Sequence, residues 1–164
     1  MEVLVTVEAT KQLAALLQDK GWMLATAESC TGGLIAAACT ELPGSSNWFE
    51  RGFVTYSDEA KIELLGVDAA AIAAHGAVSD VVVRAMASGA VRHSRARVSV
   101  AVTGIAGPTG GSKDKPVGTV WIGFMVGGLV TSEMKRFAGD RAAVREATVD
   151  HALAGLLLRL GSAG

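Results

Sequence analysis

Ser29, Cys30 and Thr31 place three potential nucleophiles side by side in the segment ATAESCTGG, residues 25–33. An apolar, strand-like run precedes them, and two glycines follow at once. A hydroxyl or thiol at a strand end, facing the start of a helix, can attack an acyl carbon while backbone N–H groups stabilise the developing negative charge. The segment therefore predicts nucleophilic catalysis, although a glycine-rich turn between a strand and a helix is also a common structural connection.

Two further segments hold residues that could assist such a nucleophile. The segment YSDEAK supplies a phenol at Tyr56 and an amine at Lys61, and both groups can move protons. The glycine-rich stretch that begins at Thr103 and Gly104 can present backbone N–H groups to a phosphate or an oxyanion. Each segment also has an ordinary interpretation, because a tyrosine at a strand end usually packs and a lysine on a short helix is usually a solvated charge.

The sequence GPTGGSK, residues 107–113, invites comparison with a phosphate-binding P-loop. The match fails because Ser112 stands where the second glycine is required, and Asp114 follows the lysine where a serine or threonine would bind magnesium. The histidines give no metal-ligand spacing either, since they are well separated along the chain: His75, His93 and His151. We therefore expect no nucleoside triphosphatase activity, no metal and no cofactor.

The composition indicates a single domain, residues 1–164, that is not a general nucleic-acid binder. A chain of 164 residues with 50% hydrophobic content can bury a sizeable core. Its 15 basic and 16 acidic residues nearly cancel, which excludes a broad electrostatic attraction to nucleic acid. The two cysteines, Cys30 and Cys39, match neither a zinc spacing nor a disulfide framework, which favours reduced thiols in the cytoplasm.

The hydropathy pattern predicts a soluble, unexported protein without membrane contact. No apolar run approaches the roughly 20 residues that cross a bilayer. The N-terminus lacks the basic start and long apolar stretch of a signal peptide. The sequence leaves open whether the chain forms a homo-oligomer.

Alternating apolar periodicities predict a three-layer α/β/α sandwich with a mixed, mostly parallel sheet. We expect helices over residues 6–20, 32–42, 69–74, 80–93 and 140–160, and a short helix after Ser57 that carries Lys61. We expect strands over residues 22–28, 53–56, 98–103, 117–126 and 130–137, the last two forming a hairpin. Ligands of such sheets bind beyond the carboxyl ends of the parallel strands, where all three chemically interesting segments fall.

Five segments in this order resemble one known family: ATAESCTGG, GSSNWFERGFVTYSDEAK, HGAVS, VTGIAGPTGGSKDKPVGTVW and FAGDR. Together they closely resemble the C-terminal domain family of the competence-damage protein CinA, whose active members are nicotinamide-nucleotide amidases. The likeness spans nearly the whole chain. Longer relatives carry an additional N-terminal domain, so this chain looks like the stand-alone amidase form.

The resemblance implies hydrolysis of the carboxamide of nicotinamide mononucleotide to nicotinic acid mononucleotide and ammonia. It implies a serine nucleophile with a lysine and a tyrosine nearby, and the matching positions are Ser29, Lys61 and Tyr56. We expect the substrate, with its phosphate, to be bound by the glycine-rich turns and by the arginine of GDR, that is by Cys30, Thr31, Gly32, Gly33, Thr103, Gly104 and Arg141.

Several assignments stay open at the level of sequence. The helix dipole and partial burial favour a neutral Lys61, whereas Asp58 and Glu59 oppose this effect, so either Lys61 or Tyr56 could accept the proton. Cys30 is a rival nucleophile without an evident histidine partner. Arg141 could merely cap the region before the last helix. A non-catalytic module that binds or senses a pyridine nucleotide would use the same glycine-rich loops, but would not need the three catalytic side chains.

Overall fold

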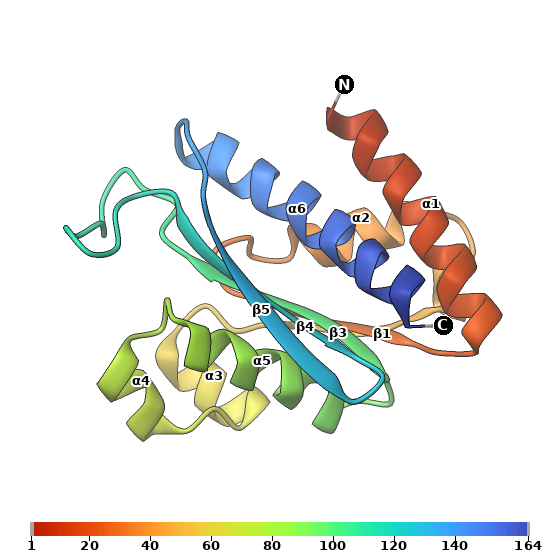
Figure 1. Cartoon of the computed structure of the whole chain (residues 1–164), viewed down its shortest axis with the longest axis horizontal. Coiled ribbons are helices and arrows are strands. Elements are labelled where there is room, and N and C mark those ends of the chain that lie inside the picture. The colour runs from red at the N-terminus through yellow and green to blue at the C-terminus, as the bar shows by residue number, and fades with distance from the viewer. Residues whose placement is uncertain (1, 164) are drawn as a thin grey trace.

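The computed structural model describes residues 2–163, in which helices and strands alternate along most of the chain (Figure 1). The helices are α1 (Glu2–Lys20), α2 (Leu34–Thr40), α3 (Asp58–Leu65), α4 (Ala69–His75), α5 (Asp80–Arg92) and α6 (Arg141–Ser162). The strands are β1 (Leu24–Glu28), β2 (Phe49–Val54), β3 (Val98–Gly104), β4 (Thr119–Val126) and β5 (Leu129–Arg136), and a short 3-10 helix, η1 (Ser45–Asn47), precedes β2. None of the helices in this described part is long and apolar enough to span a bilayer.

Within residues 2–163 the strands form one five-stranded sheet in the order β2-β1-β3-β4-β5. Strands β2 and β3 both pair in parallel with β1, whereas β4 and β5 are added in antiparallel fashion as a hairpin. The predicted mixed sheet is confirmed, and its parallel part consists of these first three strands. Glu28, the last residue of β1, is in register with Val54 on one side and Val102 on the other. The carboxyl ends of all three parallel strands therefore meet at one place.

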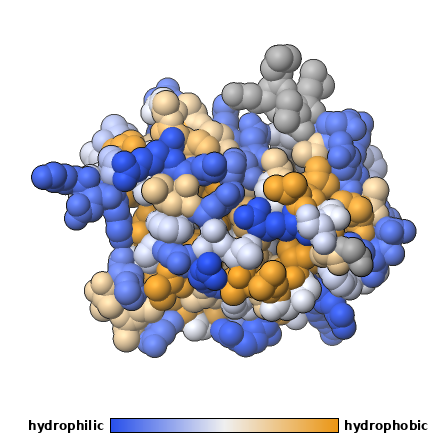
Figure 2. Space-filling model, in the orientation of Figure 1, coloured by the Kyte–Doolittle hydropathy of each residue, from blue (hydrophilic) through white to orange (hydrophobic). Residues whose placement is uncertain are grey.

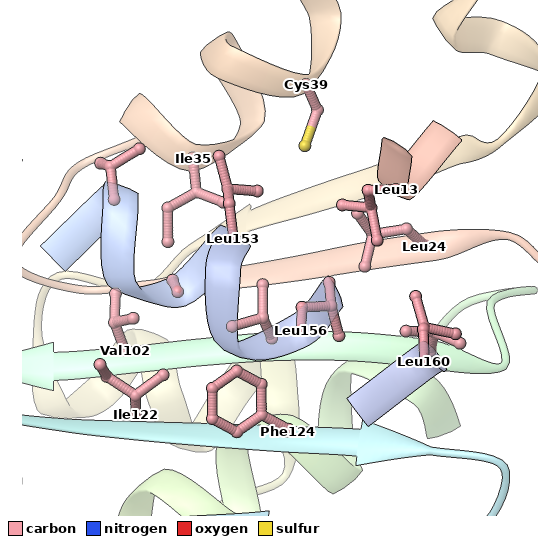
Figure 3. Packing of buried hydrophobic residues seen from close by; sticks show 14 of the residues in the cluster. Leu13, Leu24, Ile35, Cys39, Val102, Ile122, Phe124, Leu153, Leu156 and Leu160 are labelled. Atoms are coloured by element: carbon pink, nitrogen blue, oxygen red, sulfur yellow. The ribbon is translucent and has the colours of Figure 1, made fainter. Parts of the chain in front are cut away.

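Helices cover both faces of the sheet, as predicted for a three-layer sandwich. Helices α1, α2 and α6 lie on one face, and α3, α4 and α5 lie on the other (Figure 1). Helix α6 presents leucines at the spacing of one helix face to the sheet, and burying each one stabilises the fold by about 1.5–3 kcal/mol. Figure 3 shows this packing, in which the buried side chains include Leu153, Leu156, Leu160, Val102 and Phe124.

Helix α5 holds α3 against the sheet through an unusually close contact. A Cβ placed on Gly89 of α5 would lie 2.0 Å from the carbonyl oxygen of Leu65, the last residue of α3. Only glycine allows the two helices to approach this closely. The contact matters for the site described below, because α3 is short and carries Lys61 in its buried face.

The observed elements differ from the predicted ones mainly at their ends. Helix α2 begins at Leu34 rather than at residue 32, because Gly32 and Gly33 adopt φ values of 59° and 114° in the left-handed region. Strand β2 begins at Phe49 rather than at residue 53. Its first residues include charged side chains that break the apolar run, which an edge strand tolerates because one side of it faces solvent.

Replacing Gly89 by alanine should destabilise the protein, since the added methyl group must push α3 and α5 apart. We expect Gly89→Ala to lower the free energy of unfolding by roughly 1–3 kcal/mol, as overpacking does elsewhere. The control is Gly161→Ala in α6, whose added Cβ would meet nothing within 4 Å and should be neutral or slightly stabilising. Urea unfolding followed by circular dichroism measures both variants. Equal midpoints for the two would contradict the close approach of α3 and α5.

Candidate active site

A cavity of about 330 Å³ opens where the three parallel strands end. Its walls come from the turn after β1, the turn after β2, the segment 103–110 after β3, and the start of α6. The structure brings most of the predicted site residues together here, and those that line the cavity are Ser29, Cys30, Tyr56, Lys61, Thr103, Gly104 and Arg141. Segments far apart in the sequence thus meet because β1 lies between β2 and β3.

Lys61 is the most unusual residue of the cavity, because its side chain is only 1% exposed and carries no carboxylate partner at hydrogen-bond distance among residues 2–163. Its Nζ lies 3.1 Å from the Oγ of Ser29. The same Nζ donates to the backbone oxygens of Thr55 at 2.9 Å and Tyr56 at 3.2 Å. Burial lowers the pKa of Lys61, and the nearby charge of Asp58 opposes this shift only in part.

The three contacts of the Lys61 Nζ match the three N–H groups of an ammonium, but burial shifts the equilibrium towards the neutral amine. An uncharged lysine has two N–H groups and one lone pair, and the two backbone oxygens at Lys61 account for the two N–H groups. The lone pair can then face the hydroxyl of Ser29, which becomes the donor of the bond between them. The pair can act as nucleophile and general base, the arrangement required for covalent catalysis.

Ser29 sits at the end of β1, where the sheet itself positions it. Its N–H donates to the carbonyl of Val102 in β3 at 3.1 Å, which continues the strand pairing by one residue. Its neighbour Cys30 is 5% exposed, and burial raises the pKa of that thiol to about 11. A thiol with this pKa stays protonated and unreactive near neutral pH, which favours Ser29 over Cys30 as the nucleophile.

Glu28 has a structural role that the sequence analysis did not assign. Its buried carboxylate accepts the N–H groups of Ile35 at 2.8 Å and Ala36 at 3.1 Å at the start of α2. It also accepts the hydroxyl of the fully buried Thr31. These two amides of the helix start are therefore unavailable to a substrate, because the chain supplies its own anion.

The remaining residues predicted in the first turn lie behind the cavity wall. Thr31 is turned towards Glu28, and neither Gly32 nor Gly33 is among the residues that line the cavity. Both glycines instead let the chain turn into α2 through positive φ angles. Their proposed contact with substrate stays a prediction, while their conformational role is visible in the structure.

Tyr56 and Arg141 meet at the rim of the cavity. The Nη2 of Arg141 donates to the phenol oxygen of Tyr56 at 3.0 Å, and Nη1 donates to the carbonyl of Gly107 at 2.9 Å. Tyr56 is 60% exposed, and its phenol accepts the hydrogen bond from Arg141. Its backbone oxygen accepts the separate hydrogen bond from Lys61. Arg141 follows the N-cap Asp140 and joins the start of α6 to the segment after β3. Around it, the loop over residues 110–116 projects from the molecule with a hydrophilic surface (Figure 2).

Thr103 and Gly104 form the back wall of the cavity. The buried hydroxyl of Thr103 donates to the carbonyl of Ala77 at 3.1 Å, which ties β3 to the segment between α4 and α5. A Cβ on Gly104 would lie 2.6 Å from a methyl group of Val120 and 3.0 Å from the oxygen of Thr119. Glycine at position 104 is therefore required by packing, independently of any ligand.

Arg145 contacts the nucleophile turn and was missed by the sequence analysis. Its Nε donates to the carbonyl of Cys30 at 3.1 Å and its Nη2 to that of Thr31 at 3.3 Å. The signal available in the sequence was its spacing, because a residue four positions after Arg141 lies on the same face of a helix.

The chain described here, residues 2–163, contains no group of three or more His, Cys, Asp or Glu side chains arranged to hold a metal ion.

Comparison with known proteins identifies the family of the chain. The model of the CinA C-terminal domain family matches residues 6–160. The chain belongs to the CinA C-terminal domain family. This CinA domain is 55% identical over 139 residues to the nicotinamide-nucleotide amidohydrolase PncC of Enterobacter agglomerans, covering 84% of this chain and 85% of that protein.

Further relatives extend the likeness to the fold. The CinA domain is 49% identical over 147 residues to the protein of the same name from Escherichia coli K12, covering 89% of each chain. It superposes on the crystal structure of a competence/damage inducible protein from Agrobacterium tumefaciens with a TM-score of 0.92 at 45% identity, covering 96% of each chain. The α/β fold of the CinA domain is thus the fold of solved members of its family.

The thiols of this CinA domain should be unreactive in the folded state. Burial raises the pKa of Cys30 to about 11 and that of Cys39 to about 12, so thiolate is scarce at pH 8. We expect a thiol reagent such as DTNB to modify neither cysteine within minutes at pH 8, and both after unfolding in guanidinium chloride. The Cys39→Ala variant isolates the response of Cys30. Rapid modification of that variant while it is folded would contradict a buried, protonated Cys30 and revive it as the nucleophile.

Proposed function

We propose that this chain is a nicotinamide-nucleotide amidase, which hydrolyses the carboxamide of nicotinamide mononucleotide to nicotinic acid mononucleotide and ammonia in pyridine nucleotide salvage. The single observation that carries the proposal is the buried contact of 3.1 Å between the Nζ of Lys61 and the Oγ of Ser29. The relatives at 49% and 55% identity are named nicotinamide-nucleotide amidohydrolases, which supports the same reaction class and substrate. The free, buried cysteines are consistent with a reducing cytoplasm.

The first half of the proposed reaction transfers the acyl group to the enzyme. Neutral Lys61 takes the proton from Ser29 as the Oγ attacks the carboxamide carbon, which leaves a negative charge on the former carbonyl oxygen. The tetrahedral intermediate then collapses, the C–N bond breaks, and the proton passes from Lys61 to the departing nitrogen. The products of this half are ammonia and a nicotinoyl ester on Ser29.

In the second half of the reaction, water hydrolyses the ester and Lys61 again carries the proton. Lys61 is neutral again, so it can take a proton from a water molecule that attacks the ester carbon. The ester C–O bond breaks, and Ser29 recovers its proton from Lys61. Because no step needs a fixed negative charge beside the amine, a lysine held by backbone oxygens is sufficient.

The nucleotide phosphate would bind at the rim of the cavity, where Arg141 supplies a planar guanidinium suited to two parallel hydrogen bonds. Thr103 and Gly104 would contact the substrate deeper in the cavity, since both line it. A purely non-catalytic binding module is disfavoured by the buried amine. Burying the amine of Lys61 costs free energy, and a module that only binds a nucleotide at the rim would gain nothing from that burial.

Replacing Ser29 by alanine tests the nucleophile. The variant keeps the cavity and the phosphate-binding groups, so we expect turnover of nicotinamide mononucleotide to fall by roughly 10³-fold or more while binding is retained. Ammonia release and isothermal titration calorimetry on one preparation measure the two quantities. Near-full activity of Ser29→Ala would exclude the serine mechanism, whereas loss of binding together with activity would point to a disrupted cavity.

Replacing Lys61 by arginine tests the proton acceptor. Arginine is positively charged at every pH of the assay and does not deprotonate, so it cannot accept the proton and kcat should fall by roughly 10²–10⁴-fold. In the parent protein the rate should rise with pH as Lys61 loses its proton. Because burial lowers the pKa of Lys61, that rise should occur below the ordinary lysine value of about 10.4. Steady-state rates between about pH 6 and 10 measure the effect. An unchanged kcat with only a raised KM would remove Lys61 from this role and leave Tyr56 as the candidate.

A further inference from the structure

The turn that carries Ser29 contains two backbone donors that bond to no other residue in the described part of the chain. The N–H of Gly32 donates to the carbonyl of Ser29 and that of Leu34 to the carbonyl of Thr31, both at 3.1 Å. The N–H groups of Cys30 and Thr31, which lie between these bonds, donate to no other residue within residues 2–163, and the N–H of Cys30 meets only its own thiol. Both residues are buried, and a buried unpaired N–H is rare enough in proteins to call for an explanation.

Arg145 of α6 fixes the direction of this turn. Its guanidinium donates hydrogen bonds from Nε to the carbonyl oxygen of Cys30 and from Nη2 to that of Thr31. In a planar trans peptide the N–H points opposite to the C=O. The bond from Arg145 to the oxygen of Cys30 therefore directs the N–H of Thr31 away from Arg145.

The same turn is anchored independently on its other side. The carboxylate of Glu28 accepts the hydroxyl of Thr31 and the first N–H groups of α2, which removes those helix-start donors from reach of a ligand. Within this turn, the donor left for an anionic oxygen beside Ser29 is the N–H of Cys30. Cys30 is the residue that follows the nucleophile and it lines the cavity, as an oxyanion donor must.

We propose that Arg145 is a positioning residue, which holds the turn 29–32 so that the N–H of Cys30 stabilises the oxygen that becomes negative when Ser29 attacks a carboxamide. The inference rests on the proposed function, because it takes Ser29 as the nucleophile. Arg145 itself does not line the cavity, and its hydrogen bonds go to Cys30 and Thr31 rather than to Ser29. Its effect passes through two carbonyl groups to the amides of the same turn.

A matched control exists on the same helix. Arg159 donates from Nε to the hydroxyl of Thr131 at 2.9 Å and from Nη1 to the carbonyl of Gly155 at 3.0 Å, far from the residues that line the cavity. Replacing Arg159 removes the same kind of side-chain hydrogen bonds from α6 as replacing Arg145. A merely structural contribution of Arg145 should thus resemble that of Arg159, with a change in melting temperature and an unchanged kcat.

The test compares Arg145→Ala, Arg145→Lys and Arg159→Ala with the parent in ammonia release from nicotinamide mononucleotide. We expect Arg145→Ala to lower kcat by about 10²-fold and to change KM by less than about 3-fold, because misplaced donors weaken the transition state rather than substrate binding. Lysine at position 145 can reach one carbonyl at a time and should give an intermediate kcat. Millimolar guanidinium should restore part of the kcat of Arg145→Ala and leave Arg159→Ala unchanged. A kcat for Arg145→Ala within about 2-fold of the parent would overturn the inference while the proposed function stands.

A second readout separates this inference from the choice of substrate. A fluorophosphonate reacts with an activated serine by forming a P–O bond to Oγ and releasing fluoride, while the serine proton passes to the base and the phosphoryl oxygen needs the same donors. We expect the rate of labelling of Ser29 to fall in Arg145→Ala and not in Arg159→Ala. If the parent releases no ammonia but its labelling depends on Arg145, the substrate is wrong and the role of Arg145 survives. If Ser29 of the folded parent is not labelled at all, both proposals fail.

Discussion

The burial of one lysine amine is the constraint on which the rest of the site depends. Lys61 is held by two backbone oxygens and one hydroxyl rather than by a carboxylate, so no opposite charge in direct contact stabilises an ammonium that has lost its water. The fold therefore favours the neutral amine, which can accept a proton. Any rearrangement that admitted water or brought a carboxylate to Lys61 would favour the ammonium form and abolish that property.

Keeping Lys61 buried next to Ser29 requires close packing on both sides of the sheet. The register of β1 with β2 brings Thr55 and Tyr56 to the end of β1, where their carbonyl groups are available to the amine. Helix α3 reaches this position because α5 offers a glycine at the contact with Leu65. The catalytic geometry is thus set by backbone positions, and small residues at the contacts are what make those positions possible.

The turn that carries Ser29 is held by charges of opposite sign. Glu28 binds donors at the start of α2, and Arg145 binds acceptors in the turn itself. Each charged group satisfies polar backbone groups that would otherwise be buried without partners. The amides of Cys30 and Thr31, which follow Ser29, donate to no other residue in the described part of the chain. A strand-to-helix turn of this kind can therefore support anion stabilisation even though the helix start itself is already occupied by Glu28.

The sequence by itself determined the alternation of helices and strands, the hairpin at Gly127 and Gly128, and the convergence of the three segments that contain Ser29, Lys61 and Thr103. These features follow from local periodicity, turn residues and the rule that ligands bind beyond parallel strand ends. The tertiary structure alone decided which partners the polar groups have. Two residues show this clearly: Glu28 occupies the helix start that was expected to bind substrate, and Arg145 reaches across from a helix more than a hundred positions away. The physical reason is that a hydrogen-bond partner depends on distances between segments, and those distances are set by packing that no local pattern encodes.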